Sequence, residues 1–136
     1  MKARNSKTEW LSGPPAAVIE RTRSGLSADW LGRMSAHLGM PRTQLYEAVG
    51  LSRSTMENRI RLKQPLSAAE GDRLVRIARA LQRAEDVLGS EAAAIQWLRR
   101  AIRSVGGVAP ITLLDTEAGY ELVLDTLGRI EQGIAA

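Results

Sequence analysis

The chain contains no cysteine and a single histidine, His37, among its 136 residues. Without cysteine it can form no disulfide, no thiolate nucleophile and no cysteine-ligated zinc site. One histidine cannot build a histidine cluster, and it has no thiol or base partner from which a catalytic triad could be assembled. We therefore expect no metal, no cofactor and no enzymatic activity. The lack of cysteine also fits a reducing compartment, so we expect a cytoplasmic protein.

Aromatic residues are scarce at 4%, and phenylalanine is absent, whereas hydrophobic residues make up 44% of the chain. A core without large rings must be built from Leu, Ile, Val, Ala and Met, which suits packed helices. No apolar run approaches the roughly 20 residues that a membrane-spanning helix needs. The N-terminus is polar and charged, unlike a signal peptide. The expected fold class is all-α, with no membrane partner.

Positive and negative charges are unevenly distributed along the chain. Residues 1–63 carry 11 Lys and Arg against 5 Asp and Glu, whereas residues 104–136 carry 1 against 5. A basic front half suggests a polyanion such as nucleic acid, which an acidic end would repel. The two ends are therefore expected to meet different partners.

Helical periodicity and cap residues divide the front part into short helices. Residues 1–14 show no sustained periodicity and are expected to form a mobile arm. Gly25, Gly39 and Gly50 are expected to end successive helices. The sequence predicts helices over 15–24, from Ser27 to about Leu38, over 41–49, and from Ser52 to about Leu62. A capping box, Ser67-Ala-Ala-Glu70, predicts a longer helix that ends near Gly89.

The rest of the chain also shows helical patterns. Ser90 is expected to begin a helix that runs as far as Gly106-Gly107, and 110–114 is expected to form a short turn. Asp115 or Thr116 is expected to cap the final helix. In that helix apolar residues form one stripe, and three acidic residues line the opposite side. The stripe consists of Tyr120, Val123, Leu124, Leu127 and Ile130, and the acidic row of Glu117, Glu121 and Asp125.

The two helices around Gly50 have the spacing of a helix-turn-helix, a motif that binds DNA. In the second helix Met56 and Ile60 would face inward, so the other side chains would face a DNA groove. The predicted DNA-binding residues combine base readers with phosphate contacts: Arg42, Arg53, Ser54, Glu57, Asn58, Arg59, Arg61 and Lys63. In that set Arg suits guanine, Asn suits adenine, and Glu57 could accept from cytosine.

Two other interpretations of this region stay open. Tyr46 occupies the fifth place of the motif, where a small residue is usual, and it could alter the angle between the helices. In a shifted register Gly39 would be the turn residue and the helix over 41–49 would read the DNA. The outward-facing side chains of that helix suit a DNA groove less well. The other interpretation is a basic pair of helices that faces solvent and has no role in DNA binding.

Three motifs of the last 40 residues, taken in order, resemble one known family. These are Trp97-Leu98 before Gly-Gly-x-x-Pro at 106–110, Leu-Leu-x-Thr-x-x-Gly at 113–119, and Gly-Arg-Ile-Glu-x-Gly at 128–133. Together they are similar to the C-terminal domain of Xre/MbcA/ParS-type antitoxins. The stretch from Gly50 to Leu81 also resembles that family's helix-turn-helix and connecting helix. The resemblance covers roughly residues 24–136.

The resemblance implies an antitoxin that neutralises a RES-domain toxin, which consumes NAD or transfers its ADP-ribose, and that represses its own operon. The family's C-terminal end blocks the toxin's NAD cleft. Carried over to this sequence, the implied toxin-binding residues are Thr116, Glu117, Arg129, Glu131, Gln132, Gly133 and Ile134. Many relatives place an aromatic residue where this chain has Ala135, so a slim insertion is expected rather than a stacked ring. Within this chain, Arg129 could instead form a surface ion pair.

The resulting domain division is a mobile arm (1–14), a helix-turn-helix DNA-binding region (15–66), a connecting helix (67–89) and a toxin-binding domain (90–136). Operator DNA and the toxin are the expected partners, with a homodimer inside a toxin–antitoxin hetero-oligomer. Two alternatives remain. One is a stand-alone transcriptional regulator whose C-terminal half dimerises or senses a ligand. The other is a helical adaptor without DNA contact.

Overall fold

The computed structural model describes residues 14–133. All regular elements in this range are α-helices or short 3-10 helices, so the all-α expectation is confirmed. Only two isolated backbone bridges join extended residues there, Ser27 with Pro65 and Ile102 with Val108. No helix in the described part is long and apolar enough to cross a membrane. The predicted arm lies outside the described residues except for Pro14.

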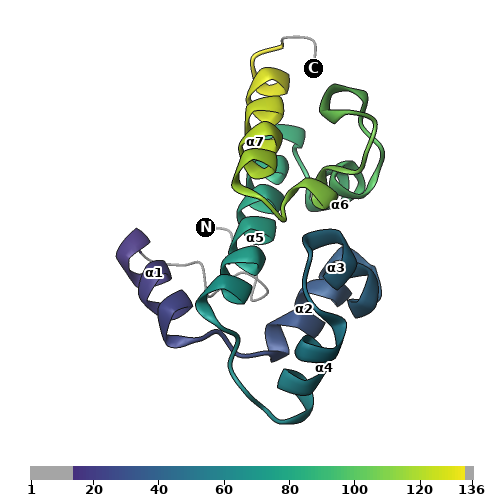
Figure 1. Cartoon of the computed structure of the whole chain (residues 1–136). Coiled ribbons are helices and arrows are strands. Elements are labelled where there is room, and N and C mark those ends of the chain that lie inside the picture. Colours follow the sequence, from purple (N-terminus) through teal and green to yellow (C-terminus); the bar gives the residue numbers. More distant parts are fainter. Residues whose placement is uncertain (1–13, 134–136) are drawn as a thin grey trace. The chain divides into compact units, whose positions relative to one another are not determined.

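The chain divides into two compact units, and each is described separately. The N-terminal unit ends at Val75 and the C-terminal unit begins at Arg76. Both residues lie in α5 (Ala68–Leu88), so one helix contributes to the cores of both units (Figure 1). The domain limits expected at residues 66 and 89 stay predictions.

Four short helices and the first part of α5 form the N-terminal unit. They are α1 (Pro15–Ser24), α2 (Asp29–Leu38), α3 (Arg42–Val49) and α4 (Arg53–Arg61). Their apolar side chains, chiefly Leu and Met, fill a core without phenylalanine. Its fully buried members include Leu31, Leu38, Leu45, Val49, Met56 and Leu74.

Cap residues begin and end these helices largely where the sequence predicts. Gly39 and Gly50 adopt left-handed backbone angles, with φ of 69° and 68°, and so end α2 and α3 at low steric cost. The Ser52 side chain accepts a hydrogen bond from the Thr55 amide at the start of α4. Ser27 was expected to cap α2 directly, but the helix begins at Asp29, and Ser27 Oγ accepts from the Asp29 amide at 3.3 Å.

The C-terminal unit contains the rest of α5, α6 (Glu91–Arg99), two 3-10 turns and α7 (Glu117–Glu131). The 3-10 turns are η2 (Arg103–Val105) and η3 (Pro110–Leu113). The prediction that the Ser90 helix reaches Gly106 is wrong, because the helix ends at Arg99. Ile102 then turns extended, and its backbone bridges to Val108 around the η2 turn.

The Leu-Leu-x-Thr-x-x-Gly motif connects η3 to α7. Thr116 caps α7 by accepting a hydrogen bond from the Gly119 amide at 3.0 Å, which confirms one of the two expected caps. Gly119 packs so closely on Leu113 that an added Cβ would overlap the Leu113 carbonyl oxygen. Arg76 donates to the carbonyl oxygen of Leu114 at 3.3 Å. The motif is therefore a tight turn that only glycine completes.

Candidate functional sites on α4 and the end of α7

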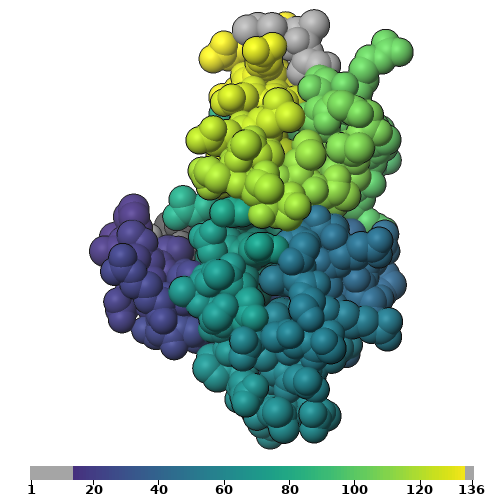
Figure 2. All heavy atoms as spheres, viewed as in Figure 1, coloured from purple at the N-terminus to yellow at the C-terminus, as the bar shows by residue number. Residues whose placement is uncertain are grey.

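Helix α4 presents the predicted reading side chains to solvent. Met56 is buried at 1% exposure and fixes the inward face of the helix. Arg53, Ser54, Asn58 and Arg61 are exposed on the remaining surface. Helix α4 thus forms part of the outer surface of the N-terminal unit (Figure 2). Arg61 donates to Oδ1 of Asn58 at 3.0 Å, so two predicted readers lie together.

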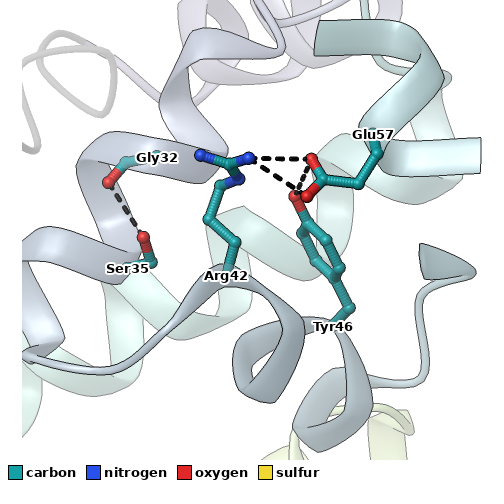
Figure 3. A network of polar contacts seen from close by, with 5 residues as sticks. All are labelled: Gly32, Ser35, Arg42, Tyr46 and Glu57. Atoms are coloured by element: carbon teal, nitrogen blue, oxygen red, sulfur yellow. Dashed lines mark hydrogen bonds and ion pairs between the residues drawn. The ribbon is translucent and has the colours of Figure 1, made fainter. Parts of the chain in front are cut away.

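Two other predicted DNA contacts, Arg42 and Glu57, are paired with each other. Nη2 of Arg42 donates to both carboxylate oxygens of Glu57, at 3.0 Å and 3.1 Å. The hydroxyl of Tyr46 lies 3.2 Å from Glu57 Oε2 and donates to it (Figure 3). The hydrogen bond that Arg42 donates to Glu57 raises the pKa of Arg42, and burial raises the pKa of Tyr46. These contacts join α3 to α4 across the turn.

Arg59 is also engaged within the protein. Its guanidinium forms an ion pair with Glu70 at 2.6 Å, and side-chain exposures of 26% and 15% make the pair half-buried. Glu70 also completes the predicted capping box, accepting from the Ser67 amide at 2.7 Å. Burial acts to raise the pKa of Glu70, but the hydrogen bonds from Arg59 and Ser67 lower it overall.

Lys63 is the remaining predicted phosphate contact. It is exposed, and it is the non-glycine residue with a positive φ, 54°, in the described range. Gln64 then donates its amide to the Arg59 carbonyl at 2.8 Å, which ends α4 in a turn. The lysine ammonium therefore lies at the surface just beyond the end of α4.

In the C-terminal unit, α7 carries the predicted toxin-binding residues. Its acidic row of Glu117, Glu121 and Asp125 is exposed. Glu117 is 67% exposed and lies 3.8 Å from Arg76, a loose ion pair. Thr116 is exposed but its hydroxyl is occupied by the helix cap.

The last turn of α7 is tied to α5 by an ion pair that the sequence did not predict. Nη1 and Nη2 of Arg83 donate to the two oxygens of Glu131, at 2.9 Å and 2.7 Å. This hydrogen bonding lowers the pKa of Glu131. Arg129, Gln132 and Gly133 are exposed; of the seven predicted residues, Ile134 lies outside the described range.

Sequence reasoning therefore missed the partners Tyr46, Glu70 and Arg83. Glu70 was recognised as a cap, but its second partner, Arg59, is 11 residues away in the chain. Arg83 and Glu131 are separated by 48 residues, and no local spacing rule covers such a pair. The sequence did give a signal for Tyr46. A tyrosine at a position where the motif usually has a small residue needs a nearby acceptor for its hydroxyl.

Comparison with known proteins finds two family models in succession along the chain. The model of the antitoxin Xre-like helix-turn-helix domain matches residues 17–79. The model of the antitoxin Xre/MbcA/ParS C-terminal toxin-binding domain matches residues 83–133. The chain belongs to the Xre antitoxin family. Helices α3 and α4 lie in the first matched domain, and α6 and α7 in the second.

Individual relatives agree with this assignment over most of their length. The chain is 36% identical to Antitoxin Xre of Photorhabdus laumondii over 126 residues, which cover 92% of this chain and 84% of the relative. It is 30% identical to the Prs ADP-ribosylating antitoxin of Sphingobium sp. over 131 residues, 90% and 82% of the two chains. Antitoxin Xre of Yersinia enterocolitica is 26% identical over 118 residues, 86% and 80%. All three relatives are named as antitoxins.

Membership of this family indicates the general role of the protein. It is an antitoxin of a toxin–antitoxin system, with a helix-turn-helix domain followed by a toxin-binding domain.

Proposed function

We propose that this antitoxin neutralises a RES-domain toxin by inserting its C-terminal end into the toxin's NAD cleft, and that it represses its own operon through α4. The observation that carries the proposal is the succession of the two matched domains over residues 17–133 of one chain. The name of the Sphingobium relative, an ADP-ribosylating antitoxin, supports ADP-ribose chemistry in the system.

The charge of α7 supports the toxin half of the proposal. Its exposed acidic row can meet the cations with which an NAD site holds pyrophosphate. The residues beyond Glu131, Gln132 to Ala136, carry no charged side chain, so their entry into a narrow cleft would cost little desolvation. The proposed toxin contacts remain Thr116, Glu117, Arg129, Glu131, Gln132, Gly133 and Ile134.

The surface of α4 supports the DNA half. Arg53, Ser54, Asn58 and Arg61 are exposed together on a helix of the shape that enters a major groove. Lys63 follows as a phosphate contact. Such proteins usually read paired half-sites as dimers, so we expect a homodimer within the toxin complex. Because repression takes place on DNA, we expect the protein in the cytoplasm.

Co-purification of the chain with the product of the adjacent gene tests both halves. We expect a stable complex, a partner that depletes NAD once freed from the chain, and restored inhibition when the chain is added back. The complex should bind the DNA upstream of the operon more tightly than random DNA of equal length. A freed partner that leaves NAD intact would contradict the toxin half, and equal affinity for both DNAs would contradict the DNA half.

A further inference from the structure

Tyr46 of α3 and Glu57 of α4 are joined by a hydrogen bond between the two helices. The Tyr46 residue is 1% exposed and occupies a place where helix-turn-helix motifs usually have a small side chain. A buried phenol hydroxyl needs a hydrogen-bond partner, since an unsatisfied one costs stability. Glu57 supplies that partner at 3.2 Å from the facing helix. The large ring in α3 is therefore tolerated because α4 carries a carboxylate opposite its hydroxyl.

Arg42 completes this group. Glu57 Oε1 accepts from Arg42, and Oε2 accepts from both Arg42 and Tyr46. Each carboxylate oxygen is thus already engaged inside the protein. These three bonds occupy all but about one of the roughly four acceptor sites of a carboxylate, so little is left with which the 34% exposed side chain could accept from a cytosine.

Arg42 keeps donors that do not face Glu57. Both of its bonds to the carboxylate come from one terminal nitrogen, Nη2. The other terminal nitrogen points away from the carboxylate, and the side chain is 45% exposed (Figure 3). A guanidinium that holds a carboxylate with one terminal nitrogen can meet a phosphate with its other donors.

We propose that Glu57 is a positioning residue of the DNA-binding surface rather than a base reader: with Tyr46 and Arg42 it fixes the orientation of α4 on α3. Arg42 then links this group to a DNA phosphate. The base-reading set narrows to Arg53, Ser54, Asn58 and Arg61. This inference deepens the proposed DNA function and rests on it.

Replacement of Glu57 is expected to change promoter affinity in the direction opposite to the one that electrostatic repulsion alone would give. Removing a carboxylate from a DNA-binding surface ordinarily raises affinity for any DNA, because a repulsion of the phosphates is lost. Glu47→Ala provides the matched control: Glu47 is an exposed glutamate of α3, one residue beyond Tyr46. We expect Glu47→Ala to bind promoter DNA as well as or slightly better than wild type. Glu57→Ala should bind the promoter about tenfold more weakly while its affinity for random DNA does not fall.

Conservative variants separate positioning from loss of folding. Glu57→Gln keeps an oxygen that can accept from Tyr46 and Arg42, so most of the promoter affinity should return. Tyr46→Phe removes only the hydroxyl and should weaken promoter binding about threefold. In the Glu57→Ala background the same Tyr46→Phe change should cost nothing further, because the partner is already gone.

The experiment measures binding of the full chain to its own promoter fragment, to random DNA and to promoters substituted one base pair at a time. All variants are compared at one salt concentration and at a temperature where circular dichroism shows each to be folded. The expected result is a promoter-specific loss for Glu57→Ala, spread over all substituted promoters and rescued by Glu57→Gln. Unchanged or tighter promoter binding by Glu57→Ala would overturn this inference alone. So would a loss of affinity that disappears only on the promoter substituted at one particular base pair, because Glu57 would then be the reader of that base pair. A wild-type chain that does not distinguish promoter from random DNA would overturn the proposed DNA function, and this inference with it.

Discussion

The N-terminal and C-terminal units use ion pairs differently. In the N-terminal unit the Arg59–Glu70 pair is half-buried, with side-chain exposures of 26% and 15%, and it also completes a helix cap. In the C-terminal unit the Arg83–Glu131 pair is more open, at 36% and 48%. Among the described glycines of that unit, the tightest packing is instead in the backbone, at the turn where Gly119 lies against Leu113. Burial, and not charge type, therefore decides which of these pairs stabilise the fold and which remain available to a partner.

The largest effect is expected at the tight turn of the C-terminal unit. Gly119→Ala would drive a Cβ into the Leu113 carbonyl, so backbone must move. We expect a loss of about 3 kcal/mol in the free energy of unfolding, measured by urea denaturation. Gly128→Ala is the control in the same helix, since its added Cβ meets nothing within 4 Å. That variant should gain up to about 1 kcal/mol from helix propensity; equal losses in both would contradict the tight turn.

The half-buried pair of the N-terminal unit should give the next largest effect. Glu70→Ala removes the partner of Arg59 and half of the capping box, and should cost about 2 kcal/mol of unfolding free energy. Glu85→Ala, on the same helix and with no ion pair to another described residue, should change it by less than about 0.5 kcal/mol. A Glu70 variant as stable as the Glu85 variant would show that the half-buried pair contributes nothing.

The same pair should make stability sensitive to acid. The pKa of Glu70 is lowered in the folded chain from its ordinary value of 4.5, so folding favours the charged form. That contribution is fully present above pH 4.5 and is lost as the pH falls through the lowered folded value. Urea denaturation between pH 6 and about pH 3 should show a shallower loss of stability for Glu70→Gln than for wild type. Parallel curves for the two proteins would exclude Glu70 as a source of the acid sensitivity.

The smallest change in stability is expected at the open pair of the C-terminal unit. Arg83→Ala should leave the unfolding curve almost unchanged because both partners are exposed to water. It should nevertheless return the pKa of Glu131 upward toward its ordinary value, since Arg83 lowers it. A titration followed by NMR of the Glu131 carboxyl carbon tests this. A pKa of Glu131 that does not move would show that the pair does not persist in solution.

Local sequence signals predicted most of the helices. Ser52, the Ser67–Glu70 box, Gly39 and Gly50 act within four residues of the atoms they bind or shape, so their effects are visible in the sequence alone. The end of α6 was missed because it depends on a backbone bridge between Ile102 and Val108, which no residue type specifies.

The sequence predicted which residue types form the candidate sites, but not which of those side chains are already bonded within the protein. The exposed face of α4 follows from the helical period once Met56 is placed inside. The engagement of Glu57 by Tyr46, and of Glu131 by Arg83, depends on how separate helices pack, and charge patterning does not contain that information.

The most direct test of the account is a comparison of two variants in two assays. One variant combines Arg53→Ala with Arg61→Ala; the other lacks residues 132–136 but keeps Glu131 and its pair with Arg83. We expect the first to lose promoter affinity at least about 30-fold while still stopping NAD consumption by the toxin. The second should bind the promoter normally and leave the toxin active. A truncated chain that still stops NAD consumption would contradict the central claim that the two ends of this antitoxin serve two different partners.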